Sequence, residues 1–234
     1  MVHVNDIRAI TLDLDDTLWE IHPVIHRAER ELYDWLGKQY PRVTEQFSRE
    51  DMHAHRAAVA DEFPQHGHDY TFMRRKVLAR VGVAAGYDAE IVDEAMAVFD
   101  SHRNAVDIFP EVRPALSALR ERFVLIAVTN GNANLEMIGI DDLFHDIVTA
   151  RTAGAAKPAK QIFDAAVDAA GCQPEQTLHV GDHPEFDVAG AISAGLHAVW
   201  VNRHGTAWPA ELQEPHGVVA HVGELPELLE RGAR

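Results

Sequence analysis

The stretch AITLDLDDTLWE, from Ala9 to Glu20, decides how the fold is interpreted, because an apolar run ends there in three aspartates, Asp13, Asp15 and Asp16. Consecutive apolar residues are typical of a strand that is buried on both faces of a sheet. Like charges at the end of such a strand repel one another unless a cation compensates them. The stretch therefore predicts a buried strand over residues 7–13 that leads into a cation-dependent site.

A helical pattern follows the aspartates from residue 20 to residue 107. Amphipathic periodicity predicts helices over residues 22–37, 48–63, 70–82 and 88–103, with no strand between them. Pro23 suits the start of the first helix, and Gly37 suits a position just past its end. Ser48 with Asp51 three residues later is typical of a capping box. We expect a small helical bundle inserted after the first strand.

Strands alternate with helices in the remainder of the chain. We expect strands over residues 123–129, 145–150, 177–182, 197–202 and 217–222, and helices over residues 113–122, 158–171, 186–195 and 225–232. This alternation predicts an α/β fold, a doubly wound parallel sheet that also includes the first strand. The expected domains are a core formed by residues 1–19 and 108–234 and a helical insert formed by residues 20–107.

Composition narrows the classes of partner. The net charge is −16, from 21 basic and 37 acidic residues, and this field repels nucleic acids and anionic membranes. No apolar stretch is long enough to span a bilayer, and the amino terminus lacks the pattern of a signal peptide. A single cysteine excludes an internal disulfide. We expect a cytoplasmic protein that acts on a small molecule, as a monomer or a small homo-oligomer.

Polar residues follow the expected strands. In doubly wound sheets ligands bind at the carboxyl ends of the strands. The side chains at these ends are Asp13 and Asp15, Thr129 and Asn130, Lys157, and Asp182. Because these ends meet at one edge of a parallel sheet, the sequence predicts a site that combines carboxylates, a hydroxyl, an amide and an ammonium.

The carboxylates of that set suit acid–base and metal chemistry. Asp13 and Asp15 would share a face if the extended backbone continued, so that one serves as an ionised nucleophile and the other as a general acid. Asp182 would complete an oxygen site suited to Mg²⁺. Asp187 would orient Lys157 or a metal-bound water, or alternatively cap a helix.

The other strand ends suit phosphate oxygens. Thr129 precedes an Asn–Gly turn, where a hydroxyl and free backbone N–H groups gather, although Asn–Gly is also a common turn signal. Pro158 disfavours helical backbone at Lys157 and suits the first position of the next helix. The Lys157 ammonium would then lie beside a helix amino terminus and bind an anion; a solvated surface lysine is the alternative.

In order and spacing, DLDDT, Thr129, Lys157 and GDHPEFD resemble the four motifs of the haloacid dehalogenase superfamily of Mg²⁺-dependent phosphotransferases, and the helical insert resembles its C1-type cap. The resemblance implies that Asp13 attacks phosphorus to form an aspartyl-phosphate. Asp15 would protonate the leaving oxygen and then deprotonate the hydrolytic water. Asp13, the backbone carbonyl of Asp15 and Asp182 would hold Mg²⁺. Thr129, Asn130 and Lys157 would neutralise the transferring group.

A narrower resemblance is to bacterial phosphatases that act on flavin mononucleotide and on the 5-amino-6-(5-phosphoribitylamino)uracil of riboflavin synthesis. It is carried by TNGNA and by the HPVI entry into the insert, with Trp19 standing where that group more often has tyrosine. Dehalogenases of the superfamily lack the second aspartate of the first motif, so Asp15 argues against that activity. The expected function is a phosphatase of this kind. The alternatives are a phosphosugar mutase, a sugar or nucleotide phosphatase, and a non-catalytic scaffold.

Side chains outside the motifs allow weaker expectations. Trp19 would pack at the hinge into the insert or stack on an aromatic substrate. The basic triplet at residues 74–76 would form a solvated helix face or attract an anion. The histidine pairs at positions 53 and 55 and at positions 66 and 68 point to different helix faces, which disfavours a metal site.

Overall fold

The computed structural model describes residues 6–231, which form two compact units. One unit contains the chain up to Glu20 together with the part from Asp107 onward, and the other contains Ile21–Val106. Within the described residues, no helix combines the length and the apolar character that crossing a membrane requires.

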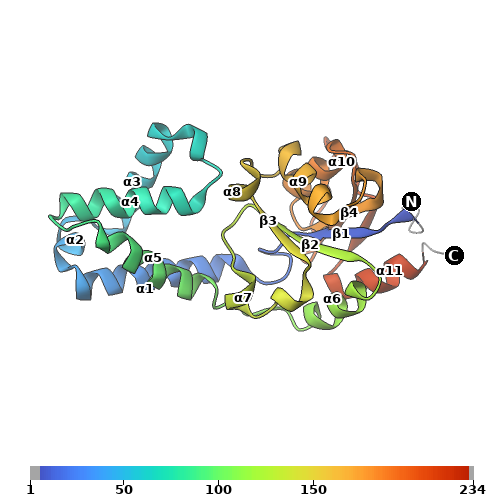
Figure 1. Cartoon of the computed structure of the whole chain (residues 1–234), viewed down its shortest axis with the longest axis horizontal. Helices are drawn as coiled ribbons and strands as arrows, with labels where there is room; N and C mark the ends of the chain where they lie inside the picture. The colour runs from blue at the N-terminus through green and yellow to red at the C-terminus, as the bar shows by residue number, and fades with distance from the viewer. Residues whose placement is uncertain (1–5, 232–234) are drawn as a thin grey trace. The chain divides into compact units, whose positions relative to one another are not determined.

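The first unit is built on a six-stranded parallel sheet in the order β3-β2-β1-β4-β5-β6 (Figure 1). The strands are β1 (Ala9–Leu12), β2 (Val124–Thr129), β3 (Asp146–Thr149), β4 (Thr177–Gly181), β5 (His197–Val201) and β6 (Gly217–Val219). β1 pairs with β2 on one side and with β4 on the other. This is the predicted doubly wound sheet, and the chain changes its direction of winding between β1 and β4.

Helices cover both faces of the sheet. They are α6 (Val112–Arg120), α7 (Leu135–Ile138), α8 (Ala150–Ala153), α9 (Lys160–Ala170), α10 (Gly190–Ser193) and α11 (Leu225–Arg231). Figure 1 shows α9 and α10 over one face and α6 and α11 over the other. On the α9 face, Ile162 and Phe163 are fully buried against strand residues such as Ile126. The predicted helix end at Gly171 is confirmed, since this glycine has φ 63° and follows α9 directly.

The second unit is all helical. Its helices are α1 (Ile21–Gln39), α2 (Pro41–Gln46), α3 (Arg49–Glu62), α4 (Tyr70–Ala84) and α5 (Glu90–Arg103). The predicted capping box is confirmed at α3, where the Ser48 hydroxyl accepts from the Asp51 N–H and the Asp51 carboxylate accepts from the Ser48 N–H. The predicted end of the first helix was wrong, because α1 continues through Gly37 to Gln39. Proline at position 41 then starts the short helix α2, which the sequence pattern did not indicate.

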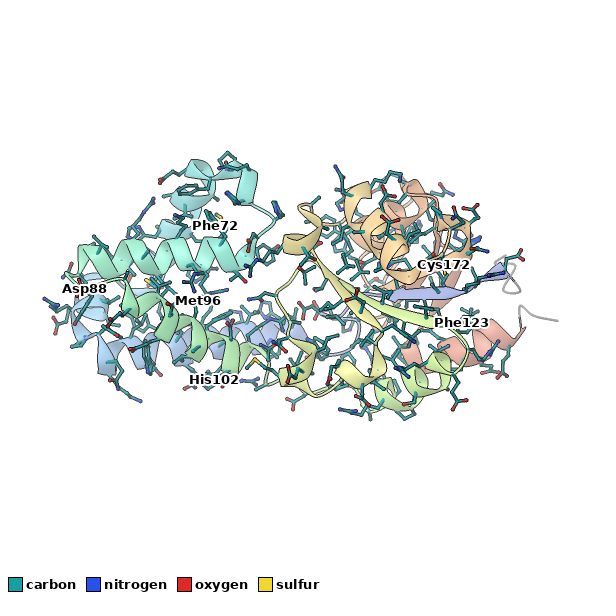
Figure 2. The ribbon with its side chains drawn as sticks, viewed as in Figure 1. Phe72, Asp88, Met96, His102, Phe123 and Cys172 are labelled. Atoms are coloured by element: carbon teal, nitrogen blue, oxygen red, sulfur yellow. The ribbon has the colours of Figure 1, made fainter. Side chains whose placement is uncertain are left out.

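The predicted solvated face is confirmed for Arg75 and Lys76 of the basic triplet, which are exposed, but not for Arg74. Arg74 is mostly buried, lies 3.5 Å from a carboxylate oxygen of Glu29, and places its guanidinium carbon 3.4 Å from the centre of the Phe99 ring. Burial lowers the pKa of Arg74 to about 10, with the nearby Arg56 adding to the effect. Figure 2 shows Phe72 and Met96 within this helical unit, where Met96 belongs to the buried apolar core. Arg74 therefore stabilises the bundle, whereas Arg75 and Lys76 lie on its exposed surface.

Candidate active site

The carboxyl ends of β1 and β4 bring two of the predicted aspartates together. Asp13 directly follows β1, and Asp182 directly follows β4, its neighbour in the sheet. The Asp13 N–H donates to Val180 O at 2.9 Å, which ties the end of β1 to β4. Carboxylate oxygens of Asp13, Asp182 and Asp187 all lie within 4.8 Å of one another. The topology thus concentrates negative charge at the point where the sheet changes its direction of winding.

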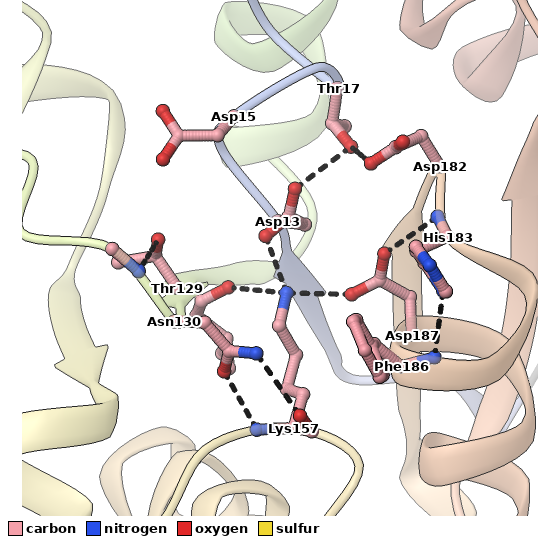
Figure 3. A network of polar contacts seen from close by, with 12 residues as sticks. Asp13, Asp15, Thr17, Thr129, Asn130, Lys157, Asp182, His183, Phe186 and Asp187 are labelled. Carbon is pink, nitrogen blue, oxygen red and sulfur yellow. Dashed lines mark hydrogen bonds and ion pairs between the residues drawn. The ribbon is translucent and has the colours of Figure 1, made fainter. Parts of the chain in front are cut away.

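Lys157 supplies the ammonium at the centre of this cluster (Figure 3). Its Nζ donates to Asp13 Oδ1, to Asp187 Oδ1 at 2.6 Å and to Val128 O at 3.2 Å. The side chain is buried, so the alternative of a solvated surface lysine is wrong. The expected position of Pro158 was also wrong, because α9 begins two residues later, at Lys160. Lys157 is therefore held by two carboxylates and a carbonyl rather than by a helix amino terminus.

Asp187 comes from a π-helical turn over Pro184–Ala189. Its Oδ1 accepts from Lys157 Nζ and lies 3.2 Å from His179 Nε2, while its Oδ2 accepts from the His183 N–H at 2.9 Å. Both oxygens therefore have protein partners already. Because Oδ1 is shared by Lys157 and His179 and Oδ2 accepts from a backbone N–H, Asp187 is well placed to orient Lys157.

The sequence did not predict two further contacts of the cluster. The Thr17 hydroxyl lies 3.1 Å from Asp13 Oδ2 and 3.2 Å from Asp182 Oδ1, bridging the two strand-end carboxylates. His179, on β4, is fully buried, and its Nδ1 lies 2.8 Å from the Thr11 hydroxyl. The threonine of DLDDT was a visible signal for the first contact. An apolar strand with a histidine in it gave no comparable signal for the second.

Asp15 lies away from the Lys157 cluster. β1 ends at Leu12, so the extended geometry that would place Asp13 and Asp15 on one face does not continue. In Figure 3 the Asp15 carboxylate points away from the Asp13 carboxylate. The indole N–H of Trp19 donates to Asp15 Oδ1 at 2.9 Å, and the Trp19 side chain is fully buried. Such burial leaves no free ring face for stacking on a substrate.

The loop after β2 joins the loop that carries Lys157. Asn130 Oδ1 accepts from the Lys157 N–H at 2.7 Å, and its Nδ2 donates to Lys157 O at 3.0 Å. The Thr129 hydroxyl accepts from the Gly131 N–H at 2.9 Å, which leaves its own O–H available as a donor. The Asn130 side chain therefore binds the backbone of Lys157, so the group of Asn130 that could bind a ligand is its backbone N–H.

The electrostatics follow from three carboxylates around one ammonium. Burial raises the pKa of Asp13 well above its ordinary value; Asp187 and Asp182 add to this rise, and Lys157 opposes it. Burial, with Asp187 and Asp16, raises the pKa of Asp182 to about 7. Burial alone would raise the pKa of Asp187, but Lys157 and His179 outweigh it and lower that pKa. Of the three carboxylates, Asp13 and Asp182 are therefore the ones whose negative charge the protein does not fully compensate.

These residues fit a hard divalent cation. Mg²⁺ prefers a few carboxylate oxygens together with water and phosphate oxygens. Asp13 and Asp182 provide such oxygens on adjacent strand ends, and their raised pKa values show that the site disfavours its own ionisation without added positive charge. A bound divalent cation would remove that penalty.

Comparison with known proteins places the chain among hydrolases. A family model described as haloacid dehalogenase-like hydrolase matches residues 7–195. The Escherichia coli 5-amino-6-(5-phospho-D-ribitylamino)uracil phosphatase YigB is 32% identical, with 95% of this chain and 96% of that protein covered. Human N-acylneuraminate-9-phosphatase is 27% identical, with 96% and 94% covered.

A solved structure is also similar over almost the whole chain. The 2-haloacid dehalogenase from Pseudomonas syringae pv. Tomato DC3000 has 39% sequence identity and a TM-score of 0.91, and the match covers 96% of this chain and 99% of that one. The similar proteins thus carry the names of two reactions, phosphate ester hydrolysis and dehalogenation.

Proposed function

Because the chain belongs to the haloacid dehalogenase-like hydrolases, we propose that it is a Mg²⁺-dependent phosphatase that hydrolyses a small-molecule phosphomonoester through a phosphorylated Asp13. One observation carries the proposal: the buried ammonium of Lys157 binds Asp13 within a cluster that also holds Asp182 and Asp187. A dianionic phosphoryl group can approach a carboxylate nucleophile only where positive charge compensates both.

In the first step, an Asp13 carboxylate oxygen attacks phosphorus while the bond from phosphorus to the ester oxygen breaks. Lys157 and Thr17 bind different oxygens of Asp13 and so fix the plane of its carboxylate. Asp15 gives its proton to the departing alkoxide. The products of this step are an alcohol, a phosphorylated Asp13 and an ionised Asp15.

In the second step, Asp15 takes a proton from a water molecule whose oxygen attacks phosphorus. The bond from phosphorus to Asp13 then breaks, which releases inorganic phosphate and restores the carboxylate. Asp13, the backbone carbonyl of Asp15 and Asp182 would hold Mg²⁺, which supplies charge neutralisation to the phosphoryl oxygens when bound. The Thr129 hydroxyl and the Asn130 backbone N–H would each donate a hydrogen bond to the phosphoryl group.

For the substrate we propose flavin mononucleotide or a phosphate ester of riboflavin synthesis. The support is the identity to YigB over nearly the full length of both chains, together with the TNGNA and HPVI segments. A sugar or nucleotide phosphatase and a phosphosugar mutase would use the same residues. A mutase would return the phosphoryl group from Asp13 to a sugar phosphate faster than water removes it.

Dehalogenation is the second candidate, because of the similarity to the Pseudomonas syringae dehalogenase. Two features favour the phosphatase. A halide leaves without a proton, so dehalogenation has no use for the acid at Asp15. The pKa of Asp182, raised to about 7, also indicates a site that favours an added cation, and a divalent cation neutralises the charge of a phosphoryl group.

A substrate panel with Mg²⁺ tests the proposal. Release of phosphate from flavin mononucleotide, ribitylaminouracil phosphate, N-acylneuraminate 9-phosphate, nucleotides and sugar phosphates is compared by kcat/KM with halide release from 2-haloacids. We expect phosphate release that requires Mg²⁺ and is lost in Asp13→Asn. Halide release without phosphate release would overturn the proposal, and a low rank for flavin mononucleotide and ribitylaminouracil phosphate would remove the substrate assignment alone.

A further inference from the structure

Trp19 lies beside Asp15 because the chain reverses between them. Asp16 has φ 64°, the left-handed backbone that aspartate tolerates better than most residues. The Leu18 N–H donates to Leu14 O at 2.8 Å, and the Asp16 N–H donates to Trp19 O at 2.8 Å. These two hydrogen bonds close the turn and bring Trp19 back to Asp15.

The indole of Trp19 is fixed in this position. Its side chain is fully buried, and so are those of Leu14 and Leu18 on the same turn. The Phe109 N–H donates to Leu18 O at 3.0 Å, which connects the turn to the segment that precedes α6. An indole has one polar hydrogen and no acceptor, and here that hydrogen is donated to Asp15 Oδ1 at 2.9 Å. A buried donor left without a partner is unfavourable, so the contact restrains Asp15.

We propose that Trp19 is a positioning residue for the general acid: its indole N–H holds Asp15 Oδ1, so that Oδ2 carries the proton and exchanges it with the substrate. This inference rests on the proposed function and extends it. In a protonated carboxyl group the carbonyl oxygen is a better hydrogen-bond acceptor than the hydroxyl oxygen, so a donor N–H favours the carbonyl oxygen. When Asp15 is protonated, the hydrogen therefore resides on Oδ2, and the fixed indole sets the direction in which Oδ2 points.

The reaction gives this positioning a specific signature. Protonation matters most for a leaving group that is a strong base, such as an alkoxide, and least for p-nitrophenolate, which leaves without help. General acid catalysis contributes typically 10²–10⁴-fold. A misdirected acid should therefore slow the hydrolysis of alkyl phosphates and spare p-nitrophenyl phosphate. A merely structural defect would lower both rates together.

The experiment compares Trp19→Phe, which keeps an aromatic ring but removes the N–H, with the wild type over phosphate esters of graded leaving-group basicity. We expect kcat for alkyl phosphates to fall at least about tenfold more than kcat for p-nitrophenyl phosphate, a part of the general-acid contribution. In an Asp15→Asn background the same substitution should add no further selectivity. Trp208→Phe is the matched control, since the indole of Trp208 donates to the backbone oxygen of Leu212 at 3.2 Å.

A second readout does not depend on activity. The chain has four tryptophans, so the indole N–H signals in a ¹H–¹⁵N spectrum are few, and Trp19→Phe identifies the signal of Trp19. We expect Asp15→Asn to shift that signal upfield, because a neutral amide oxygen accepts a weaker hydrogen bond than a carboxylate. Asp164→Asn, which alters an exposed pair with Lys160, should leave it unchanged.

The outcomes separate the two proposals. A wild type that releases phosphate from no ester contradicts the proposed function. A wild type that is active, with a Trp19→Phe variant that slows all esters equally, overturns the positioning role and leaves the function intact. An indole signal that does not respond to Asp15→Asn also overturns the positioning role.

Discussion

Asn130 and Lys157 are joined by a pair of hydrogen bonds in which the asparagine side chain binds both backbone groups of the lysine, at 2.7 Å and 3.0 Å. The residues come from loops that follow different strands, β2 and β3. The side chain beside Thr129 thus positions the loop that delivers the buried ammonium to Asp13.

Asn130→Ala should lower kcat/KM about tenfold, because the loss of hydrogen bonds worth about 0.5–1.5 kcal/mol each frees the loop that carries Lys157. Steady-state kinetics with Mg²⁺ measures the effect. Asn202→Ala is the matched control, since Asn202 makes the same pair of bonds with the backbone of Thr206, both at 2.9 Å. Equal activity losses in the two variants would contradict the positioning of Lys157 by Asn130.

Lys157→Met should lower kcat by about 10²–10³-fold, the typical effect of removing one group that stabilises developing negative charge. It should also destabilise the protein by about 3–5 kcal/mol at pH 8, because Asp13 and Asp187 lose their buried partner. Denaturant unfolding and phosphate release measure the two effects. Lys160→Met removes an exposed pair with Asp164 and should cost no more than about 1 kcal/mol. A Lys157 variant as stable and active as the Lys160 variant would refute the central role of this ammonium.

Mg²⁺ should stabilise the protein more at pH 8 than at pH 5.5. The pKa of Asp182 is raised to about 7 by burial and by Asp187, whereas an unfolded aspartate titrates near 3.9. Between the unfolded pKa near 3.9 and the folded pKa of about 7, the folded state binds more protons than the unfolded state. This group's contribution to the free energy of unfolding is therefore lost as pH rises through the folded pKa. A bound cation compensates the ionised form.

Thermal unfolding with and without Mg²⁺ at the two pH values measures this linkage, and Asp182→Asn is the variant that should remove most of the Mg²⁺ effect at pH 8. An equal Mg²⁺-induced shift in Tm at both pH values would be inconsistent with Asp182 as a titrating ligand of the metal.

Gly181→Ala should disturb the site from inside the sheet. A Cβ at this position would lie 2.3 Å from Asp187 Cγ, closer than atoms in contact can approach. We expect a loss of about 1–3 kcal/mol in the free energy of unfolding, together with a loss of activity as Asp187 moves away from Lys157. Gly67→Ala is the control, because its nearest neighbour would be Pro64 O at 3.5 Å. Normal activity in Gly181→Ala would show that the position of Asp187 is not critical.

Local patterns were sufficient to predict the sheet and the meeting of its strand ends. The apolar run before Asp13 and the strand–helix alternation indicated parallel strands, and topology alone then placed Asp13 beside Asp182 and brought Lys157 to them. Helix ends were less predictable. Gly37 could have stopped α1, but the helix continued until Pro41 began the next one.

The contacts that the sequence did not predict depend on tertiary distances. His179 reads as an interruption in an apolar strand, and only the folded sheet shows its ring between Thr11 and Asp187. Arg74 reads as part of a charged helix face, but Glu29 and Phe99 on other helices bury it. The role of Trp19 likewise required the left-handed turn at Asp16, which no pattern in the stretch specifies.

The most direct test of the central claim is to trap the phosphorylated intermediate. The protein is mixed with a radiolabelled phosphate ester and Mg²⁺, quenched in acid within a single turnover, and digested, and the label is located by peptide. We expect the label on the peptide that contains Asp13, and none in Asp13→Asn. Rapid phosphate release in the wild type with no label on that peptide at any quench time would contradict the account.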